Sequence, residues 1–424
     1  MKWIHRPHIS IFPLIASALI IAWATYSEFL APANNQLAQY FDKTIIISGI
    51  ISDDIEFKKD DYRIKLKTNS GLIFVMLEKL PMQLARSDQL TLQGKIQAGF
   101  GNYAAFIYRP SIKSVSHPNM PDFAMKLRDI FSQSVVEQID NGEQSNLALS
   151  YLTGQKTLLT EEQKKKLRLA GLAHVVVASG YHLAVVVGLA KKYLGKISRF
   201  ACAAGALLLM TIYISVTGFT PSMARAGLMT ALSLLAWYYG RKFHPARLIL
   251  YVMALSLIYD SSLIINLAWQ LSFASYTGII FVTPVLIKFF YGEKQPGFVA
   301  NIIIASISAQ LFCLPLTLYY FGSVPLLALV ANILVTPAIP FAMLGTFLLG
   351  ITRIPPFIFA TKQILYFQLW IIDGIAAIPW ASIEFETENP LVFLAYIPIV
   401  VLILSLKWST RYSYRPSYAK IYAC

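Results

Sequence analysis

Two histidines in one apolar run are the first residues of this sequence that suggest chemistry. His174 and His182 lie eight residues apart in AGLAHVVVASGYHLAVVVG, so in a continuous helix they would share one face. Paired imidazoles can bind a metal ion, but the zinc-peptidase motif HExxH uses a closer spacing and adds a glutamate, which this run lacks. We therefore expect histidines that form hydrogen bonds, and no metal, cofactor or catalytic residue.

One arginine near the start of a second apolar run suggests a different chemistry. In TGFTPSMARAG, Pro221 suits the first turn of a helix, which places Arg225 about one turn further along, after Gly218 and Ser222. A guanidinium at the centre of a membrane helix costs about 2.5–3.5 kcal/mol on insertion scales. Arg225 therefore either faces a water-filled passage for an anionic solute or reaches to the membrane surface. The spacing leaves both interpretations open.

Further polar residues and prolines interrupt the other apolar runs. Prolines break or kink membrane helices where the freed backbone groups find partners or line a cavity. A pore and ordinary packing between helices are both consistent with this pattern. The candidate residues of a passage are His174, Ser179, Gly180, His182, Gly218, Pro221, Ser222, Arg225, Asp260, Gln270, Ser272, Gln310, Asn332 and Pro337.

The composition indicates which elements carry these residues. Of 424 residues, 56% are apolar and only 14% are charged, whereas a soluble domain has about 25% charged residues. So few charges cannot cover a soluble surface, which excludes a cytoplasmic globular enzyme, and three cysteines exclude a disulfide scaffold. The sequence predicts a polytopic α-helical membrane protein.

The charges also predict how the chain crosses the membrane. Residues 9–30 form one apolar run and nine more runs follow residue 171. Lys and Arg gather in every second connection, which the positive-inside rule places in the cytoplasm; these connections contain Lys191, Arg241, Lys288, Arg353 and Lys407. We expect about ten segments in the cytoplasmic (inner) membrane, with both termini cytoplasmic. The predicted divisions are an anchor at 1–31, a helical membrane domain at 171–407 and a basic tail at 408–424.

Residues 42–117 have a different pattern. Five short runs rich in β-branched residues alternate with turn-forming segments such as DDIEFKKD and TNSG. They predict a small barrel such as an OB-fold outside the cytoplasm, although an SH3-like barrel has a similar pattern. Residues 121–170 then predict amphipathic helices for the membrane surface, one of which begins with a capping box at Thr160 and Gln163. Packing on the barrel is the alternative for these helices.

Four ordered motifs resemble those of the ComEC-type competence family. The run around His174 is similar to the family pattern SGLxHLLAISGLHVG, and TGFTPSMARAG is similar to TGFxPSxxRA. The resemblance covers residues 10–350, and Tyr181 and Ser261 depart from it, because the family has Leu and Pro there. The matching residues are Gly171, His174, Ser179, Gly180, His182, Gly218, Phe219, Pro221, Ser222, Arg225, Ala226, Asp260, Gln270, Leu271, Ser272, Phe273, Leu314, Pro315, Phe321, Gly322, Val324, Ala331, Asn332 and Pro337.

The resemblance implies a membrane channel that passes single-stranded DNA across the cytoplasmic membrane during natural transformation. Family members have a membrane anchor, an extracytoplasmic OB-fold and a polytopic competence domain. The implied partners are single-stranded DNA, membrane lipid, an extracytoplasmic DNA receptor and a cytoplasmic motor ATPase or DNA-binding protein. In the barrel, DNA capture by stacking and phosphate contacts would use Lys65, Lys67, Tyr103, Tyr108 and Arg109.

Two other classes of protein stay open at this point. A secondary transporter for a small anionic solute would have a closed site around Arg225. A membrane-embedded metalloenzyme would use His174 and His182 with a nearby carboxylate. Many family members also continue into a metallo-β-lactamase-like domain. This chain ends soon after its last apolar run, so we expect that domain to be missing and expect no strand-degrading activity.

Overall fold

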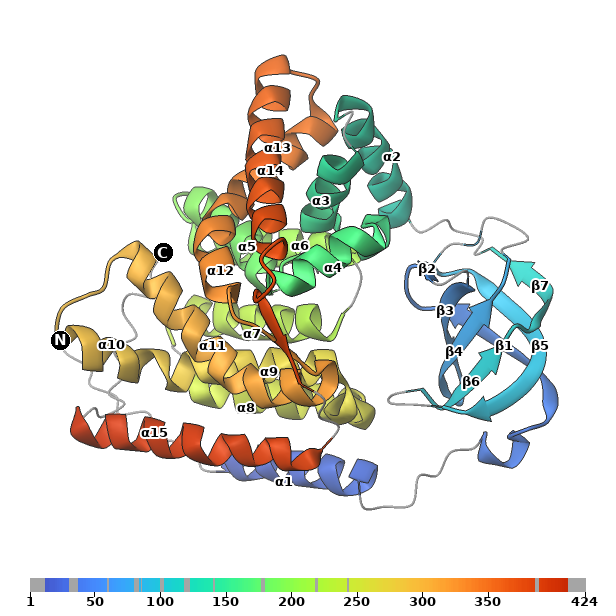
Figure 1. Cartoon of the computed structure of the whole chain (residues 1–424). Helices are drawn as coiled ribbons and strands as arrows, with labels where there is room; N and C mark the ends of the chain where they lie inside the picture. The colour runs from blue at the N-terminus through green and yellow to red at the C-terminus, as the bar shows by residue number, and fades with distance from the viewer. Residues whose placement is uncertain are drawn as a thin grey trace.

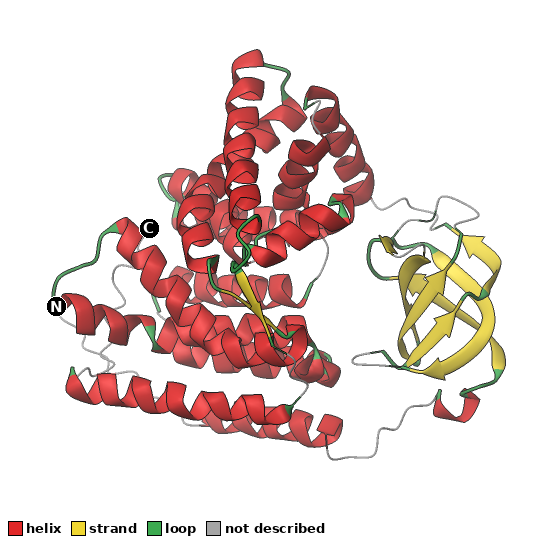
Figure 2. Cartoon of the chain, in the orientation of Figure 1, coloured by secondary structure: helices red, strands yellow, loops and turns green. Residues whose placement is uncertain are grey.

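A helical body and a β-barrel make up the molecule. The barrel lies to one side of the body (Figure 1), and Figure 2 shows that the strands gather in the barrel, apart from one short pair on the body. The computed structural model describes residues 12–29, 37–58, 61–79, 84, 86–99, 103–117, 123–139, 142–176, 180–217, 220–241, 244–385 and 389–410.

The barrel is one sheet that closes on itself. Its order β1–β3–β4–β6–β5 closes because β5 also pairs with β1; β4 and β6 run parallel, and the other pairs of the ring are antiparallel. The short strand β2 pairs with β3, and β7 pairs with β5. The strands are β1 (Thr44–Ile51), β2 (Glu56–Lys58), β3 (Asp61–Thr68), β4 (Gly71–Leu77), β5 (Gln89–Ala98), β6 (Ala105–Tyr108) and β7 (Ser111–Ser116).

The predicted small barrel is confirmed, with two differences in its strands. The last predicted strand is divided at Arg109, whose positive φ of 47° turns the chain between β6 and β7. Part of the segment predicted as a turn forms β2 instead. Alternate side chains of the ring point inward and form a buried apolar core, which explains why the β-branched pattern predicted the barrel; they include Ile64, Leu66, Ile73, Val75, Leu90, Leu92, Ile96 and Ile107.

Three helices follow the barrel and pack on the body. The helices α2 (Phe123–Gln138), α3 (Gly142–Thr153) and α4 (Glu161–Leu169) bury Val135, Tyr151 and Leu167 in a core shared with the C-terminal helices. The capping box at Thr160 is confirmed, since its hydroxyl accepts from the Gln163 backbone and the Gln163 side chain accepts from the Thr160 backbone. The sequence patterns did not indicate α3, because its buried residues include many polar side chains.

The first predicted span after the barrel is not one helix. Residues 172–176 form turns, and α5 (Gly180–Leu194) begins only at Gly180. His174 and His182 therefore do not lie on one continuous helix, so the condition for a shared helix face fails. The next runs match their predicted helices closely: α6 (Arg199–Thr217), α7 (Pro221–Tyr238) and α8 (Pro245–Tyr259).

The later runs contain breaks that the apolar pattern conceals. Residues 261–291 divide into a 3-10 turn (Ser261–Ile265), α9 (Leu267–Phe281) and α10 (Thr283–Tyr291), which has a proline in its first turn. The run after α11 (Phe298–Phe321) divides into β8 (Ser323–Pro325), α12 (Ala328–Val335), a 3-10 turn (Thr336–Ala338) and α13 (Ile339–Ile351). The chain continues through α14 (Pro355–Ala376), β9 (Ser382–Glu384) and α15 (Tyr396–Ser409), while α1 (Phe12–Phe29) packs on α8.

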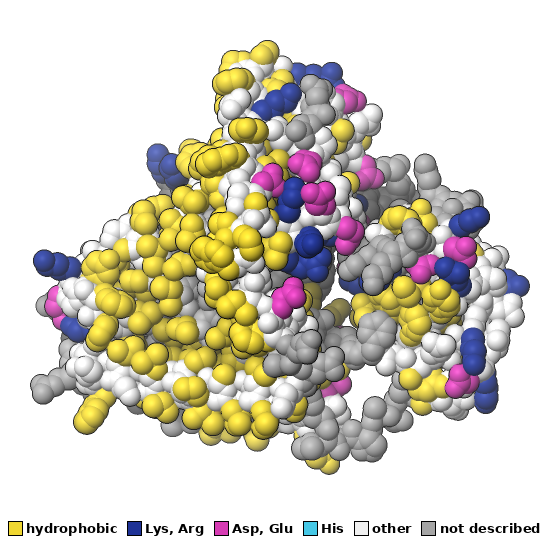
Figure 3. All heavy atoms as spheres, viewed as in Figure 1, with side chains coloured by type: hydrophobic (Ala, Val, Ile, Leu, Met, Phe, Trp, Pro, Cys, Tyr) yellow, Lys and Arg dark blue, Asp and Glu magenta, His cyan; other side chains and the backbone are white. Residues whose placement is uncertain are grey.

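Among the described residues, five helical segments are long and apolar enough to cross a membrane: Arg199–Thr217, Leu267–Tyr291, Phe298–Phe321, Ala328–Ile351 and Pro390–Ser409. Figure 3 shows a broad hydrophobic surface on the helical body. The chain is thus a membrane protein with a small β domain.

One ion pair joins the connection between α13 and α14 to α2. The Nη2 of Arg353, in this connection, lies 2.9 Å from Glu137 Oε2 on α2. Helix α2 begins beside the barrel, where Arg128 pairs with Asp54. The cytoplasmic side expected for Arg353 stays a prediction.

Candidate functional site

A half-buried arginine lies where three helices of the body meet. The Nε of Arg225 donates to Ser272 Oγ on α9 at 2.6 Å, and its Nη1 lies 3.5 Å from Met229 Sδ. The guanidinium carbon stands 5.2 Å from the ring centre of Tyr276 and 6.0 Å from that of Phe273. The hydroxyl and the two rings hold the charge in one place within the body, which a side chain reaching out to the membrane surface would not require.

The residues around Arg225 are positioned by the local sequence. Thr220 caps α7 by accepting from the Met223 backbone, and Pro221 begins the helix, so Arg225 follows directly after the first turn. Gly180 begins α5 on the other side. A Cβ at Gly180 would lie 3.3 Å from Arg225 Nη2 and 3.1 Å from the Ala226 Cβ, so glycine allows this close approach. Gly180, Arg225 and Ser272 therefore lie close together, while their role in a passage stays a prediction.

A second polar group lies between α3 and α5. His182 is fully buried, and its ring lies 6.4 Å from the ring of Tyr151, which is also fully buried. His174 has an exposed side chain in the turn before α5. Ser179 and Gly218, two further predicted residues, lie outside the described residues. The sequence missed Tyr151 because an isolated tyrosine in a polar helix gives no signal of burial.

The remaining predicted residues lie elsewhere in the body. Asp260 caps the 3-10 turn before α9 by accepting from the backbone and hydroxyl of Ser262, and Gln270 donates to the Ile264 carbonyl of the same turn. Gln310 lies in α11, Asn332 in α12 and Pro337 in the 3-10 turn before α13. Among the described side chains, Gln310 Nε2 and Asn332 Oδ1 are buried atoms without a hydrogen-bond partner.

Two family-like motifs meet at Gly171. This glycine ends α4 with a φ of +69°, and an added Cβ would lie 2.3 Å from the Ala328 Cβ and 3.0 Å from Pro325 Cγ. Pro325 belongs to β8, which pairs with β9, so the turn after α4 is held against the start of α12. Both the backbone conformation and the contact require glycine here.

We expect Gly171→Ala to remove most of the folded protein from the membrane. The left-handed backbone costs a residue with a Cβ about 1–2 kcal/mol, and overpacking typically adds about 1–3 kcal/mol. Gly188→Ala is the matched control, because a Cβ there meets nothing within 4 Å. Membrane abundance and thermal unfolding of purified protein measure the effect. Equal abundance and stability of both variants would contradict it.

The outward face of the barrel carries a row of aromatic rings. Phe74 on β4 lies 5.1 Å from the Tyr103 ring and 6.0 Å from the Phe106 ring on β6, and Phe106 lies 6.4 Å from Tyr108. These side chains point outward because their strand neighbours fill the core. Tyr103 and Tyr108 are among the residues predicted for DNA capture, and the structure adds Phe74 and Phe106 beside them. We call this row, Phe74, Tyr103, Phe106 and Tyr108, the aromatic face.

The cations beside the aromatic face are mostly paired with carboxylates. Lys65, which faces Phe74 across the sheet, lies 2.7 Å from Asp53. Arg109 stacks on Tyr108 at 5.1 Å and pairs with Asp61 and Glu78. Lys67 is exposed, and no ion pair joins it to the described residues. The rings are therefore more available for binding a ligand than the cations, most of which are already paired.

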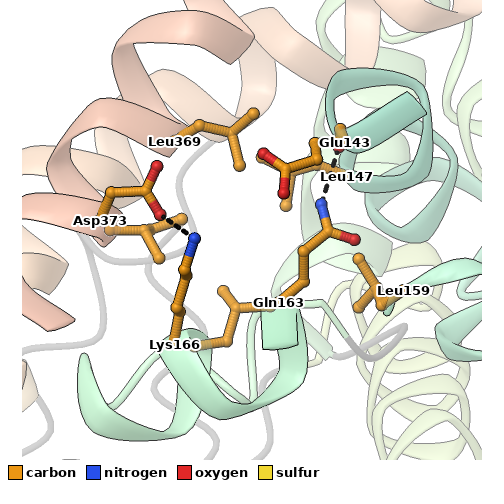
Figure 4. Close-up of a pocket in the computed structure, with 9 residues that line it drawn as sticks. Glu143, Leu147, Leu159, Gln163, Lys166, Leu369 and Asp373 are labelled. Atoms are coloured by element: carbon orange, nitrogen blue, oxygen red, sulfur yellow. Dashed lines mark hydrogen bonds and ion pairs between the residues drawn. The ribbon is translucent and has the colours of Figure 1, made fainter. Parts of the chain in front are cut away.

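A small polar cavity lies between α4 and α14 (Figure 4). It has a volume of about 10 Å³, room for one water molecule. Lys166 lies 3.1 Å from both Asp373 and Glu162, and hydrogen bonds to Asp373 first and Glu162 second raise the pKa of its ammonium group. Gln163 donates to the Glu143 carbonyl on the other side. The cavity is too small for a solute, and these contacts attach α4 to the body.

The described residues contain no group of three or more His, Cys, Asp or Glu side chains that could hold a metal ion. His174 and His182 have no such partner group among them. The chemistry that the described residues do offer is a fixed cation in the body and stacking rings on the barrel.

Comparison with known proteins adds the family. ComE operon protein 3 of Bacillus subtilis (strain 168) is 23% identical over 333 residues, which cover 73% of this chain and 42% of that protein. The chain thus spans less than half the length of this relative. No solved structure matches the chain. The model of the competence protein family matches residues 151–410, which is more than half of the sequence and includes Arg225, and the chain belongs to this family.

Proposed function

We propose that this chain takes up DNA by passing a single strand across the cytoplasmic membrane during natural transformation. Membership of the competence protein family supports the role in DNA uptake. The observation that carries the proposal is the aromatic face, because stacked rings bind single strands of any sequence and give nothing to a small inorganic anion. The barrel captures the strand, and the helical body passes it inward.

The strand arrangement of the barrel supports an OB-fold. The ring β1–β3–β4–β6–β5, with its parallel pair β4 and β6, has the five-stranded Greek-key order of that fold. OB-folds bind oligonucleotides on their second and third strands, which are β3 and β4 here. Phe74 and Lys65 lie on these two strands and face each other. Phe74 of the aromatic face thus lies on one of these two strands, and Phe106 and Tyr108 lie on the neighbouring strand β6.

In this proposal, polar residues of the body form a path that suits a polyanion. Arg225 presents one fixed cation, and one cation attracts a strand without holding it as a dense cluster would. Buried polar atoms without partners, such as Gln310 Nε2 and Asn332 Oδ1, each cost about 1–3 kcal/mol unless water reaches them. Water along these residues would hydrate the passing strand.

Other proteins complete the process in this proposal. An extracytoplasmic receptor delivers DNA, and a cytoplasmic motor ATPase or DNA-binding protein pulls the strand. The chain itself is not an enzyme, so the strand leaves it at full length.

The proposal is tested with the full chain in liposomes. Labelled single-stranded DNA is added outside, a nuclease then digests what stays outside, and the length of the protected DNA is measured. We expect protected strands of full length to accumulate with single-stranded DNA and not with duplex. A flux of small anions without protected DNA would favour the secondary transporter, and strands shortened in a divalent-dependent reaction would favour the enzyme.

We expect thiol labelling to place the barrel outside, and Lys191, Arg241, Lys288 and Lys407 inside. In Figure 1 the connection between α10 and α11 lies at the end of the body away from the barrel, and Figure 3 shows Lys and Arg side chains at that end. Single cysteines replace these residues in a chain without Cys202, Cys313 and Cys424. Labelling of Lys288→Cys by an impermeant reagent from outside would refute both the inward side and the cytoplasmic termini.

A further inference from the structure

A buried ion pair joins the barrel to the body. Arg128 on α2 donates from Nη1 to Asp54 Oδ2 at 3.0 Å and from Nη2 to Asp54 Oδ1 at 3.2 Å. Asp54 lies in the barrel, between β1 and β2. The Arg128 side chain is only 5% exposed and that of Asp54 is 23% exposed. Each terminal nitrogen of the guanidinium bonds to one carboxylate oxygen. This bidentate geometry fixes the relative orientation of the two groups as well as their distance.

Among the ion pairs of the described residues, this pair has the most deeply buried cation. Exposed pairs such as Lys95 with Asp42 contribute little, because water and salt screen them. Leaving a buried guanidinium unpaired is energetically costly. Arg128 therefore strongly favours the docked arrangement of the barrel, in which it pairs with Asp54. Asp129 lies 3.7 Å from Arg128 Nε but is 66% exposed, so it does not replace Asp54. The docked position of the barrel is therefore preferred over a detached one.

A second contact prevents the barrel from turning about the first. Arg86, in the segment before β5, donates from Nη2 to the Ser215 carbonyl on α6 at 3.2 Å. The two contacts reach different helices of the body, α2 and α6. Two separated contacts leave only rotation about the line that joins them, and the bidentate geometry of the Arg128–Asp54 pair opposes that rotation.

The fixed orientation turns a particular side of the barrel to the body. In Figure 1, β3 and β4 lie on the side nearer the body, and β5 and β7 lie on the far side. Phe74 and Lys65 belong to these two nearer strands, and Figure 3 shows hydrophobic side chains on this part of the barrel. A strand bound on the aromatic face would thus lie next to the helices that receive it.

We propose that Arg128 and Asp54 are positioning residues that hold the aromatic face toward the body, so that transfer of the strand depends on them and capture does not. The inference rests on the proposed function. Neither residue touches the aromatic face, since Asp54 lies before β2 and Arg128 on α2. Breaking the pair leaves the binding surface intact but releases its orientation.

The test compares two readouts in the full chain. Binding of a labelled single-stranded oligonucleotide is measured in nanodiscs, and uptake is measured in liposomes and normalised to protein abundance. We expect Arg128→Gln and Asp54→Asn each to bind the oligonucleotide within about twofold of the unaltered chain, while uptake falls about tenfold. The double exchange Asp54→Arg with Arg128→Asp restores the opposite charges at the same combined length, and we expect it to recover most of the uptake.

A crosslink measures the orientation directly. Cysteines replace Arg86 and Ser215 in a chain without its native cysteines, and a short thiol crosslinker joins them. We expect the crosslink yield to fall severalfold with Arg128→Gln, and the crosslinked variant to regain uptake. Lys95→Gln, which breaks an exposed pair of the barrel, is the control and should change neither readout.

The outcomes separate this inference from the proposed function. Normal uptake by both single variants, with oligonucleotide binding intact, would overturn the positioning role alone. Loss of binding and uptake together, without recovery in the double exchange, would also overturn it, because the pair would then be needed for folding. An unaltered chain that neither binds nor takes up DNA would instead overturn the proposed function.

Discussion

Replacing Arg225 by glutamine will remove most of the DNA uptake and leave the protein in the membrane at its normal level. The proposed path depends on the charge of the guanidinium, which Ser272, Phe273 and Tyr276 hold in place. Glutamine can still bond to Ser272 but carries no charge to attract phosphates. We expect uptake to fall at least about tenfold, equivalent to about 1.4 kcal/mol, which is within the range of a desolvated cation–π contact.

Two further variants separate charge from position. Arg225→Lys keeps the charge but loses the planar fork, so we expect it to retain part of the uptake. Ser272→Ala keeps the charge and loses the oxygen that orients it, so a similar partial loss is expected. The matched control is Arg247→Gln, since Arg247 is also a half-buried arginine in a helix that begins with a proline. Normal uptake by Arg225→Gln would show that this residue does not line the proposed DNA path.

Removing the rings of the aromatic face will weaken DNA binding at every salt concentration. Each stacked base contributes about 1–3 kcal/mol, so Phe74→Ala with Phe106→Ala should weaken binding by about 30-fold or more. Ile46→Ala is the control, because Ile46 is an exposed apolar residue on β1 that has no ring. Oligonucleotide binding to the full chain in nanodiscs measures the change.

The salt dependence distinguishes stacking from charge. The ring variants should keep the slope of log affinity against log salt, because they remove no phosphate contact. Lys67→Gln should lower that slope by about 0.7, the value for one contact to a single strand. Lys65→Gln should change it less, since Asp53 already neutralises Lys65. A changed slope in the ring variants with unchanged affinity would contradict stacking.

The sequence predicted what depends on local pattern. Alternating β-branched residues placed the barrel strands, and Thr160 with Gln163 gave the start of α4. Arg225 was identified because a charge in an apolar run is conspicuous. Its contact residues Ser272 and Tyr276 lie on another helix, so the sequence did not indicate that they meet it. Phe74 and Phe106 could not be separated from the core, because alternation fixes two faces of a strand without saying which one is outside.

The breaks within the helices and the long-range contacts could not be predicted from the pattern of apolar residues. An apolar run hides the 3-10 turn at Pro337 and the late start of α5 at Gly180, since burial in lipid needs only apolar side chains. The pairing of Arg128 with Asp54 joins residues 74 positions apart. Two ordinary charged residues on polar segments give no signal that they meet.

The short pair of strands β8 and β9 has a consequence for counting membrane crossings. Because Ser323 pairs with Glu384, the chain between them leaves from one place and returns to it. That closed excursion contains α12, α13 and α14, and Arg353 near its middle pairs with Glu137 on α2. A segment that returns to its starting place crosses the membrane zero or two times, never once. It therefore does not change whether the total number of membrane crossings is even or odd. The orientation of α15 is therefore independent of how deeply the excursion enters the bilayer, and reporters fused after residue 409 would read the same side in either case.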